Sequence, residues 1–417
     1  MIEGLFRETI LLILTWILIV FAAGAALGLL LLLFSLVRVF QNAPTLNSKQ
    51  FQPGQLPTNK GETLKRTELT VVVPAYNEAT NIKVCLSSIL ASDPPCNNWR
   101  VLLVDDGSTD ETVQVASAVA SVLKLEEGRF TILNAGPRPL AQRWVGKNWA
   151  CSRAMELVSS TWVLFVDADV ELHPATLKRA LNQAIEEEAD LLSLVPRINC
   201  SCSAEWMVQP IMACLLAIGF PIKAANDPTE STAFAAGPFM LFRRSTYEEI
   251  GGHRALAEVV IEDLALARRV KSGGFRLRYL LGLDALQLRM YDNFPALWEG
   301  WSKNWFLGLD SSIVKAIGAS ALVFLMFTGP WLVLLLIIVC LLWIPFYGAL
   351  LIAFTFSVIG VLLQFILRLW TRQKFEVPLT NWWLMSAGGI LIGLLGPTSV
   401  WRTLTGRDWT WKGRSLA

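Results

Sequence analysis

The stretch VLFVDADVEL, residues 163–172, is an apolar run that stops at two carboxylates, Asp167 and Asp169, with one alanine between them. A run of Val, Leu and Phe is typical of a strand buried on both faces of a sheet, and charges are costly there unless the strand has ended. We therefore expect both carboxylates at the carboxyl end of a strand. Ligands bind at this edge of an open α/β sheet, and two carboxylates there can hold a hard divalent cation directly and through water.

Around this stretch, residues 68–310 alternate between short apolar segments and helical ones. The expected strands are LTVVVPAY, RVLLVDDGS, FTILNAG and TWVLFVDAD, at residues 69–76, 100–108, 130–136 and 161–169. Between the first two strands, apolar residues recur at helical spacing within residues 78–92. This alternation predicts an α/β fold with a mostly parallel sheet flanked by helices, and functional loops at the carboxyl ends of its strands.

The chain also carries segments suited to lipid, since its hydrophobic fraction of 53% and mean hydropathy of +0.47 are too high for a wholly soluble protein. Residues 11–37 hold no charge and would reach about 40 Å as a helix, so we expect a transmembrane helix over residues 9–37. A cleaved signal peptide is the alternative, but the preceding residues are not net positive and the apolar run is about twice the usual length. A linker over residues 38–67 follows, and its basic residues favour a cytoplasmic position for the next domain.

A second membrane region is expected over residues 315–400. Residues 316–370 are nearly free of charge and long enough for two crossings, with a turn at WIPFYG, residues 343–348. The next apolar stretch, residues 382–401, either crosses once more or re-enters, because basic residues on both sides of it favour the cytoplasm. The region therefore has two to three or more helices, and a basic tail occupies residues 401–417.

Charge and cysteine content argue against two other classes of protein. The net charge is only +2 and the basic residues are scattered, so we expect no nucleic-acid partner. The seven cysteines include no CxxC pair and the chain has two histidines, which gives no zinc-finger spacing. We interpret the cysteines as reduced residues of a domain on the cytoplasmic face of a cytoplasmic or thylakoid membrane.

Two loops at strand ends carry residues suited to a nucleotide. The first, VVVPAYNEA, ends strand pairing at Pro74, offers the ring of Tyr76 to a base and offers Glu78 to polar groups. The second, DDGSTDET, contains Asp106 and a glycine that permits a tight turn. An isolated DDGS is usually only a turn with a helix cap, but here it stands between two other polar strand-end loops.

These segments, with VDADV and IEDLALARRVKSGG in the same order, resemble glycosyltransferase family 2 with the GT-A fold over roughly residues 68–310. The resemblance implies a donor pocket that includes Pro74, Tyr76, Glu78, Asp106 and Asp167. Asp167 and Asp169 resemble the DxD motif that holds Mg²⁺ or Mn²⁺ on the donor diphosphate. Such a cation would neutralise the charge that grows on the leaving nucleoside diphosphate.

Single displacement at the sugar also requires a base for the acceptor hydroxyl. The segment EVVIEDLALARR, residues 258–269, supplies Glu262 and Asp263 where an apolar lead-in meets a helix. By resemblance to the ED pair of the family, Asp263 is expected to be the base and Glu262 to orient it or the acceptor. Alone, such a pair could simply complement the dipole of a helix. No nucleophile is required, so we expect inversion at the anomeric carbon.

Four further residues are candidates for binding. Lys147 precedes a helix and could reach a phosphate of the donor. His253 follows a Gly-Gly turn and is either structural or part of an acceptor site. Trp301 and Lys303 could hold an apolar acceptor at the membrane edge, unless the tryptophans there only anchor the domain.

The acceptor is inferred from a narrower resemblance. Residues 299–305 read EGWSKNW and lack the Q-x-x-R-W motif of processive family members. With WVGKNWA, RMYDNF and WTWKGR, this segment resembles the membrane branch that glycosylates carotenoids, with hopanoid-associated enzymes as neighbours.

We therefore expect an enzyme that transfers one hexose or deoxyhexose to the hydroxyl of a lipophilic acceptor, a carotenoid above all. UDP-sugar is the expected donor, with GDP-sugar or dTDP-sugar as alternatives, and membrane lipid is a further partner. The alternative acceptors are a hopanoid, a glycerolipid or a polyprenyl phosphate. A non-catalytic membrane scaffold on the same fold is the rival from another class.

Overall fold

The computed structural model describes residues 2–47, 67–139, 141–342, 348–406, 410–411 and 414–415. The chain divides into two compact units, each described by itself below. The sheet unit comprises Asn42–Asn199, Gly219–Met290 and Asp408–Ala417. The helical unit comprises Met1–Gln41, Cys200–Ile218 and Tyr291–Arg407.

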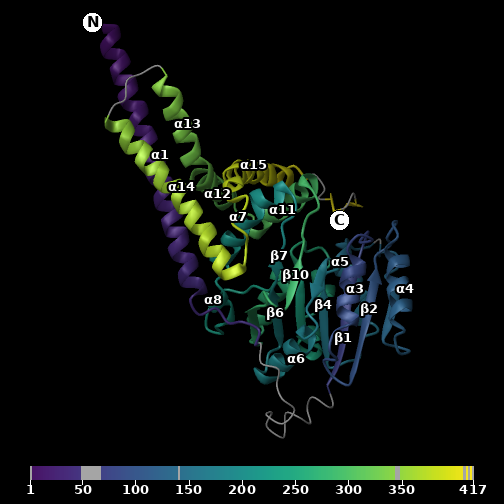
Figure 1. Cartoon of the computed structure of the whole chain (residues 1–417). Coiled ribbons are helices and arrows are strands. Elements are labelled where there is room, and N and C mark those ends of the chain that lie inside the picture. Colours follow the sequence, from purple (N-terminus) through teal and green to yellow (C-terminus); the bar gives the residue numbers. More distant parts are fainter. Residues whose placement is uncertain are drawn as a thin grey trace. The chain divides into compact units, whose positions relative to one another are not determined.

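A seven-stranded sheet forms the centre of the sheet unit (Figure 1). Its strands are β1 (Glu68–Ala75), β2 (Asn98–Asp105), β3 (Phe130–Asn134), β4 (Trp162–Val166), β6 (Leu191–Val195), β8 (Phe239–Arg243) and β9 (Leu277–Leu281). They lie in the order β3-β2-β1-β4-β8-β6-β9, and β8 alone among them runs antiparallel to its neighbours. The expectation of a mostly parallel sheet is therefore confirmed.

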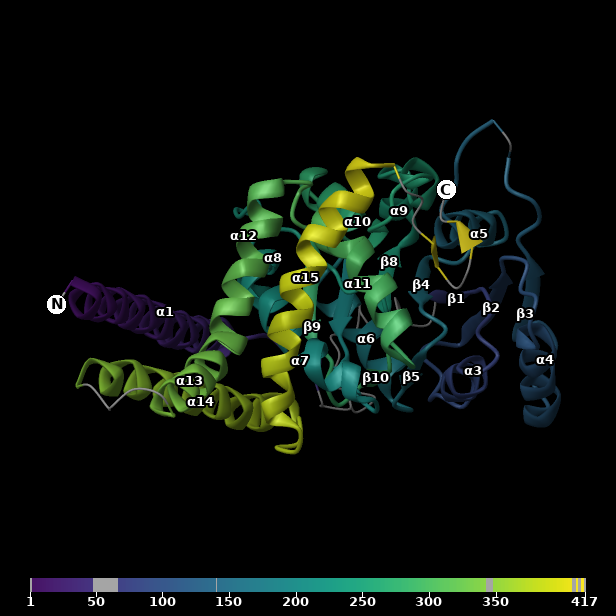
Figure 2. The ribbon, with the colours of Figure 1, turned by 90° about the horizontal axis from the view of Figure 1, so that it is seen from above.

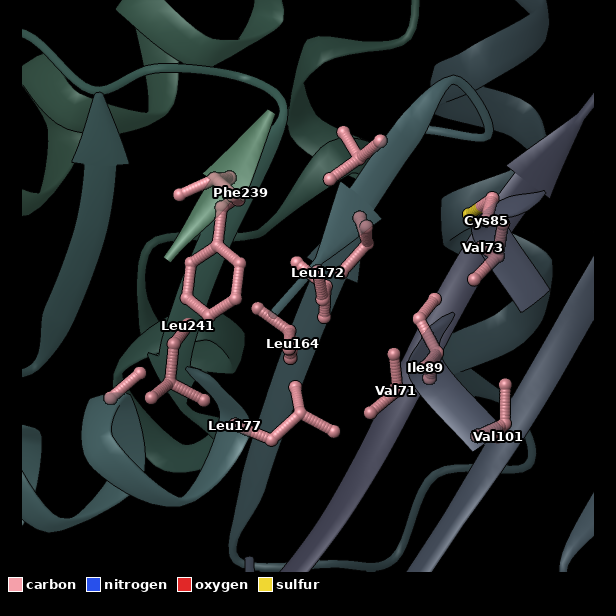
Figure 3. Close-up of a cluster of buried hydrophobic side chains, with 14 of the residues drawn as sticks. Val71, Val73, Cys85, Ile89, Val101, Leu164, Leu172, Leu177, Phe239 and Leu241 are labelled. Carbon is pink, nitrogen blue, oxygen red and sulfur yellow. The ribbon is translucent and has the colours of Figure 1, made fainter. Parts of the chain in front are cut away.

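Side chains that alternate along the strands build a core on each face of the sheet. Along β1, Val71 and Val73 belong to one core and Val72 belongs to the other. The first core packs against α3 (Ile82–Leu90), α4 (Thr112–Leu123) and α6 (Thr176–Glu186). Figure 3 shows part of it, with Cys85 and Ile89 of α3 beside the strand valines. The second core packs against α5 (Gly146–Met155), α9 (Arg244–Glu249) and α10 (Glu262–Ser272). In Figure 2 the strands are seen between these two layers of helices.

Short elements complete the sheet unit. The strands β5 (Val170–Leu172), β10 (Leu286–Leu288) and β7 (Arg197–Ile198) form a small second sheet, and β11 (Thr410–Trp411) pairs antiparallel with β12 (Arg414–Ser415). The helix α8 (Ile222–Asn226) and the 3₁₀ turn η1 (His253–Leu256) lie in the connections. Most of the expected linker, residues 48–66, lies outside the described residues.

The helical unit contains four segments that are long and apolar enough to cross a membrane. They are Leu12–Phe40, Ile313–Leu341, Gly348–Phe375 and Trp382–Leu404. Large apolar side chains point outward from them, including Val20, Phe34 and Leu335, each more than half exposed. In water this surface would be costly, and a bilayer would remove that cost. The expected turn at residues 343–348 lies outside the described residues, apart from Gly348.

The elements of the helical unit are α1 (Ile2–Phe40), α7 (Ser203–Gly219), α11 (Phe294–Gly308), α12 (Ile313–Val323), α13 (Gly329–Leu341), α14 (Gly348–Phe375) and α15 (Met385–Leu404). A π-helical turn, η2 (Phe324–Thr328), joins α12 to α13. It disturbs the helical ladder, and Gln364 of α14 donates from Nε2 to the carbonyls of Met326 and Phe327 at 3.0 and 2.9 Å. This bonding satisfies backbone groups that lipid could not.

The helices α7 and α11 belong to the helical unit, although both fall inside the range 68–310 that was read as one soluble domain. A Cβ built on Gly388 of α15 would lie only 1.8 Å from the carbonyl oxygen of Met207, so α7 packs closely on α15. Trp301 of α11 donates from its indole to Gln209 Oε1 of α7 at 2.8 Å. These contacts explain why two helices from the middle of the chain leave the α/β core.

Candidate active site

The loops after β1 and β2 are tied together at the carboxyl edge of the sheet. The backbone N–H of Asn77 donates to Ser108 Oγ at 2.9 Å, and that of Glu78 donates to Thr112 Oγ1 at 2.8 Å. Asp105 accepts from the backbone N–H groups of Gly107 and Ser108 at 3.2 Å. Asp105 therefore shapes the turn, which leaves the neighbouring Asp106 to line the cavity described next.

A cavity of about 540 Å³ opens beside this turn. It is lined by Tyr76, Asp106, Gly107, Asn134, Gly136, Pro137 and Arg414. Asp106 Oδ2 accepts from Arg138 Nη2 at 2.7 Å and from Arg414 Nη1 at 2.9 Å. Burial raises the pKa of Asp106 above its usual value, although both guanidinium groups oppose the rise. A planar ring, a carboxylate and the guanidinium of Arg414 thus line a space of nucleoside size, and Arg138 holds the carboxylate from behind the lining.

The two carboxylates of VLFVDADVEL lie in a turn between β4 and β5, as a strand-end position requires. Lys147, at the start of α5, places its Nζ 2.6 Å from Asp167 Oδ1 and 2.8 Å from Glu262 Oε1. A Cβ on Gly146 would lie 2.5 Å from Asp106 Oδ2, so the start of α5 also contacts the wall of the cavity. The α5 helix therefore connects the cavity to the carboxylates.

Asp169 carries an unsatisfied oxygen. Its Oδ1 is buried and has no hydrogen-bond partner among the described residues. Burial, followed by the charges of Asp167 and Glu78, raises the pKa of Asp169 to about 8. An ionised carboxylate in these surroundings needs a cation, and none of the described basic side chains bonds to this oxygen.

The donor set fits a divalent cation that is shared with a diphosphate. Among the described residues, no group of three or more His, Cys, Asp or Glu side chains is arranged to hold a metal ion. Mg²⁺ usually binds through one or two carboxylates together with substrate phosphates and water. Asp167 and Asp169 match that smaller set and would hold the metal, and their assignment as ligands stays a prediction.

The expected ED pair lies at the start of α10. Burial acts to raise the pKa of Glu262, but the ion pair with Lys147 outweighs it and lowers this pKa below its usual value. Asp263 accepts from the backbone N–H of Leu264 at 2.7 Å and from that of Gly237 at 3.1 Å. Burial and the charge of Glu262 raise the pKa of Asp263 to about 6. Two adjacent carboxylates are thus tuned in opposite directions.

The remaining predicted residues lie in different surroundings. The expectation that Pro74 ends strand pairing is wrong, because Pro74 is half-buried within β1, opposite Val104 of β2, and pairing continues to Ala75 opposite Asp105. His253 is only 1% exposed, and its Nδ1 lies 2.7 Å from the hydroxyl of Tyr247, with burial lowering the histidine pKa to about 3. Trp301 is buried and Lys303 half-buried on α11, in the helical unit. The assignment of His253, Trp301 and Lys303 to an acceptor site stays a prediction.

Arg138 and Arg414 belong to the site and were absent from the sequence prediction. Arg138 follows β3, so the strand-end rule that identified the other loops could also have found it. Arg414 lies in the tail, where the segment WTWKGR read only as basic. Its hydrogen bond to Asp106 joins residues 308 positions apart, a separation that no local pattern reveals.

Two family models match the chain. The model described as "Glycosyl transferase family 2" matches residues 70–251. The model described as "Glycosyl transferase family group 2" matches residues 162–369. Between them they extend from Thr70 in β1 past β9 and include the Asp167–Asp169 turn and the helix that begins with Glu262.

Curated proteins and a solved structure are also similar. The 4,4'-diaponeurosporenoate glycosyltransferase of Staphylococcus aureus (strain USA300) is 28% identical over 261 residues, which are 61% of this chain and 65% of that protein. The match therefore spans slightly less than two thirds of the relative's length. A mannosyltransferase from Pyrobaculum calidifontis, in complex with GDP-Man and Mn²⁺, aligns with a TM-score of 0.50 and 18% identity over 95% of this chain and 100% of that chain. This likeness concerns the fold alone, and it confirms the expected GT-A class.

Proposed function

Because the chain belongs to glycosyltransferase family 2, we propose that it transfers one sugar from a nucleoside-diphosphate sugar to a lipophilic acceptor, with inversion at the anomeric carbon. The acceptor we propose is a carotenoid. The resemblance to the staphylococcal diaponeurosporenoate glycosyltransferases supports this choice, as do the four apolar helices that would keep the enzyme at a membrane.

The donor binds at the carboxyl edge of the sheet. Tyr76 offers a ring face and Asp106 a carboxylate to the base, within a cavity of about 540 Å³. We propose a UDP-sugar as donor, with GDP-sugar or dTDP-sugar as alternatives. Asp167 and Asp169 would hold Mg²⁺ or Mn²⁺, which when bound neutralises charge on the leaving diphosphate. Lys147 lies against Asp167 and would reach the same phosphates.

The observation that carries the catalytic assignment is the contrast between Glu262 and Asp263. Glu262 is held ionised by Lys147, and its charge helps to raise the pKa of Asp263 to about 6. A base works best when its pKa lies near the operating pH. Asp263 would remove the proton of the acceptor hydroxyl while Glu262 keeps Lys147 in place.

A second candidate acceptor group is a carboxylate, because the name of the staphylococcal relatives describes a carotenoid acid. A carboxylate oxygen carries no proton to remove, so transfer to it would not need Asp263. Comparison of a hydroxylated carotenoid with a carotenoid acid in the Asp263→Asn variant separates the two. Loss of transfer to the alcohol with transfer to the acid retained would support Asp263 as the base for a hydroxyl and show that a carboxylate needs no base.

A lipophilic acceptor and apolar helices also suggest where the protein lies in the cell. We propose an integral membrane protein whose sheet unit faces the cytoplasm, where nucleotide sugars are made available. The basic residues of the linker, Lys49, Lys60, Lys65 and Arg66, support this orientation.

The deciding experiment is a comparison of pigment and lipid extracts from cells with and without the gene, by liquid chromatography and mass spectrometry. Loss of a carotenoid glycoside with accumulation of the free carotenoid is the expected result, and the mass difference identifies the sugar class. If the carotenoids are unchanged and a glycosylated hopanoid or glycerolipid disappears, the acceptor proposal is wrong while the transferase proposal stands.

The melting temperature of the purified protein distinguishes an enzyme with a donor site from a non-catalytic scaffold. A donor site predicts that UDP raises the melting temperature only when Mn²⁺ is present, because Asp167 and Asp169 would hold the metal that neutralises the diphosphate. A scaffold predicts no such dependence on the metal with UDP, GDP or dTDP.

A further inference from the structure

The C-terminal tail returns to the wall of the cavity at the sheet edge. Within the sheet unit, β11 and β12 pair antiparallel, and Arg414 of β12 contacts the loops after β1 and β2. Its Nη1 donates to the backbone carbonyl of Asp106 at 2.8 Å and to Asp106 Oδ2 at 2.9 Å. Its guanidinium carbon lies 5.0 Å from the ring centroid of Tyr76, within cation–π range.

These contacts leave one oxygen of Asp106 available. Arg138 and Arg414 both bond to Oδ2, whereas Oδ1 has no hydrogen-bond partner in the part of the chain that the structure describes. A carboxylate held in this way by two guanidinium groups has a fixed orientation. Its second oxygen can then accept an N–H group from the edge of a base.

The cavity remains open with Arg414 in place. Its volume of about 540 Å³ includes Arg414 among the lining residues, so the guanidinium forms a wall and leaves space beside Tyr76. Arg138 and Arg414 also place two guanidinium groups at this end of the cavity, opposite the carboxylates of Asp105 and Asp106. A nucleoside diphosphate is an anion with a planar base, and it complements both features.

We propose that Arg414 is a donor-binding residue, with which the C-terminal tail completes the base end of the donor site. The inference rests on the proposed transferase function, and it adds a specific role for a tail that the α/β fold itself does not contain. Arg414 orients Asp106 toward the base, stacks its guanidinium plane beside Tyr76 and attracts the donor. The opposite arrangement, in which the tail occupies the place of the base and competes with the donor, is an outcome of the test below.

The test measures binding of UDP, GDP and dTDP, and of inorganic diphosphate, to the purified full chain in detergent with Mn²⁺. For Arg414→Ala we expect binding of the preferred nucleotide to weaken about tenfold, as for loss of a hydrogen bond to a charged group. Binding of inorganic diphosphate should weaken much less. Arg414→Lys should recover part of the loss, because it keeps the charge without the planar stack. With activity as the readout, KM for the donor should rise while kcat at saturating donor stays unchanged.

The matched control is Arg244→Ala, because Arg244 is a partly exposed arginine of the same unit that pairs with Glu248 at 2.8 Å. It should leave nucleotide binding unchanged. Equal nucleotide binding by Arg414→Ala and the unaltered protein overturns the inference alone, and tighter binding identifies the tail as a competitor. If the unaltered protein binds none of the three nucleotides, both the inference and the proposed function are wrong.

Discussion

Asp263 has the surroundings of a base that works near neutral pH. Its pKa is raised to about 6, so the carboxyl is protonated below that pH and ionised above it. We expect kcat for a hydroxylated carotenoid to fall as the pH drops through about 6 and to level off above it. Measured kcat between pH 5 and 8 at saturating donor checks this, and a rate that stays constant over the range would contradict it.

Removal of that base should be selective. Asp263→Asn should lower kcat by about 10²–10⁴-fold while the Kd of the nucleotide stays the same. Asp284→Asn is the matched control, because Asp284 is an exposed aspartate that pairs with Arg179 at 2.9 Å. Unchanged turnover in Asp263→Asn would assign the base elsewhere, unless the acceptor proves to be a carboxylate.

Asp169 is expected to cost stability when no metal is bound. Its Oδ1 is buried without a partner among the described residues, and the carboxylates of Asp167 and Glu78 repel its charge. Asp169→Asn should therefore raise the melting temperature of the metal-free protein by a few degrees, which corresponds to about 1 kcal/mol. The same variant should lose the additional stabilisation by UDP with Mn²⁺. Retention of that metal-dependent stabilisation would rule out Asp169 as a ligand.

At the scale of single residues, the sequence predicted where the acidic residues lie but not which side chains they contact. The carboxylates after β4 could be placed at a strand end because a charge inside a buried strand is costly, whereas the ED pair was identified by its resemblance to the family. Lys147 was expected near a phosphate, and the structure reveals that it pairs with Asp167 and Glu262. Such pairing depends on how α5 meets α10, and no pattern along the chain encodes it.

At the scale of elements, β6 and β9 were not among the expected strands. The strands β1, β2, β3 and β4 followed from the sequence because each combines an apolar run with a polar loop. The division at α7 did not, because its 17 residues are apolar enough for either a soluble core or a membrane unit. A small residue on α15 allows α7 to pack in the helical unit. Gly388 allows α15 to approach the backbone of α7, and a methyl group there would contact the carbonyl of Met207.

This packing gives a prediction with an internal control. Gly388→Ala should lower the melting temperature in detergent, by an amount equivalent to about 1–3 kcal/mol, because backbone on α7 must move. Gly318→Ala, on the exposed side of α12, meets no atom within 4 Å and should be neutral or slightly stabilising. If both variants melt at the same temperature, the close contact between α7 and α15 does not contribute to stability.

At the scale of the whole molecule, the tail constrains the membrane topology. Residues 219–290 and Arg414 belong to the same sheet unit, so in the proposed membrane protein they would lie on one side of the membrane. Three apolar segments separate them, and three full crossings would place Arg414 on the other side. We therefore predict that an even number of these three segments crosses the membrane. The segment Trp382–Leu404 has the lowest mean hydropathy of these segments, 1.4 against 2.7 and 2.5, so we predict that it stays at the interface on the side of the sheet unit.

Single cysteines on either side of that segment test this topology. Thr380→Cys and Thr405→Cys flank α15 at exposed positions, and Leu342→Cys follows α13. A maleimide that does not cross membranes, applied to intact cells and to inverted vesicles, should label Thr380→Cys and Thr405→Cys from the same side and Leu342→Cys from the opposite side. The parent protein, with its own seven cysteines, sets the background. If Thr380→Cys and Thr405→Cys react from opposite sides, α15 crosses the membrane and Arg414 cannot reach Asp106 in the membrane-bound enzyme.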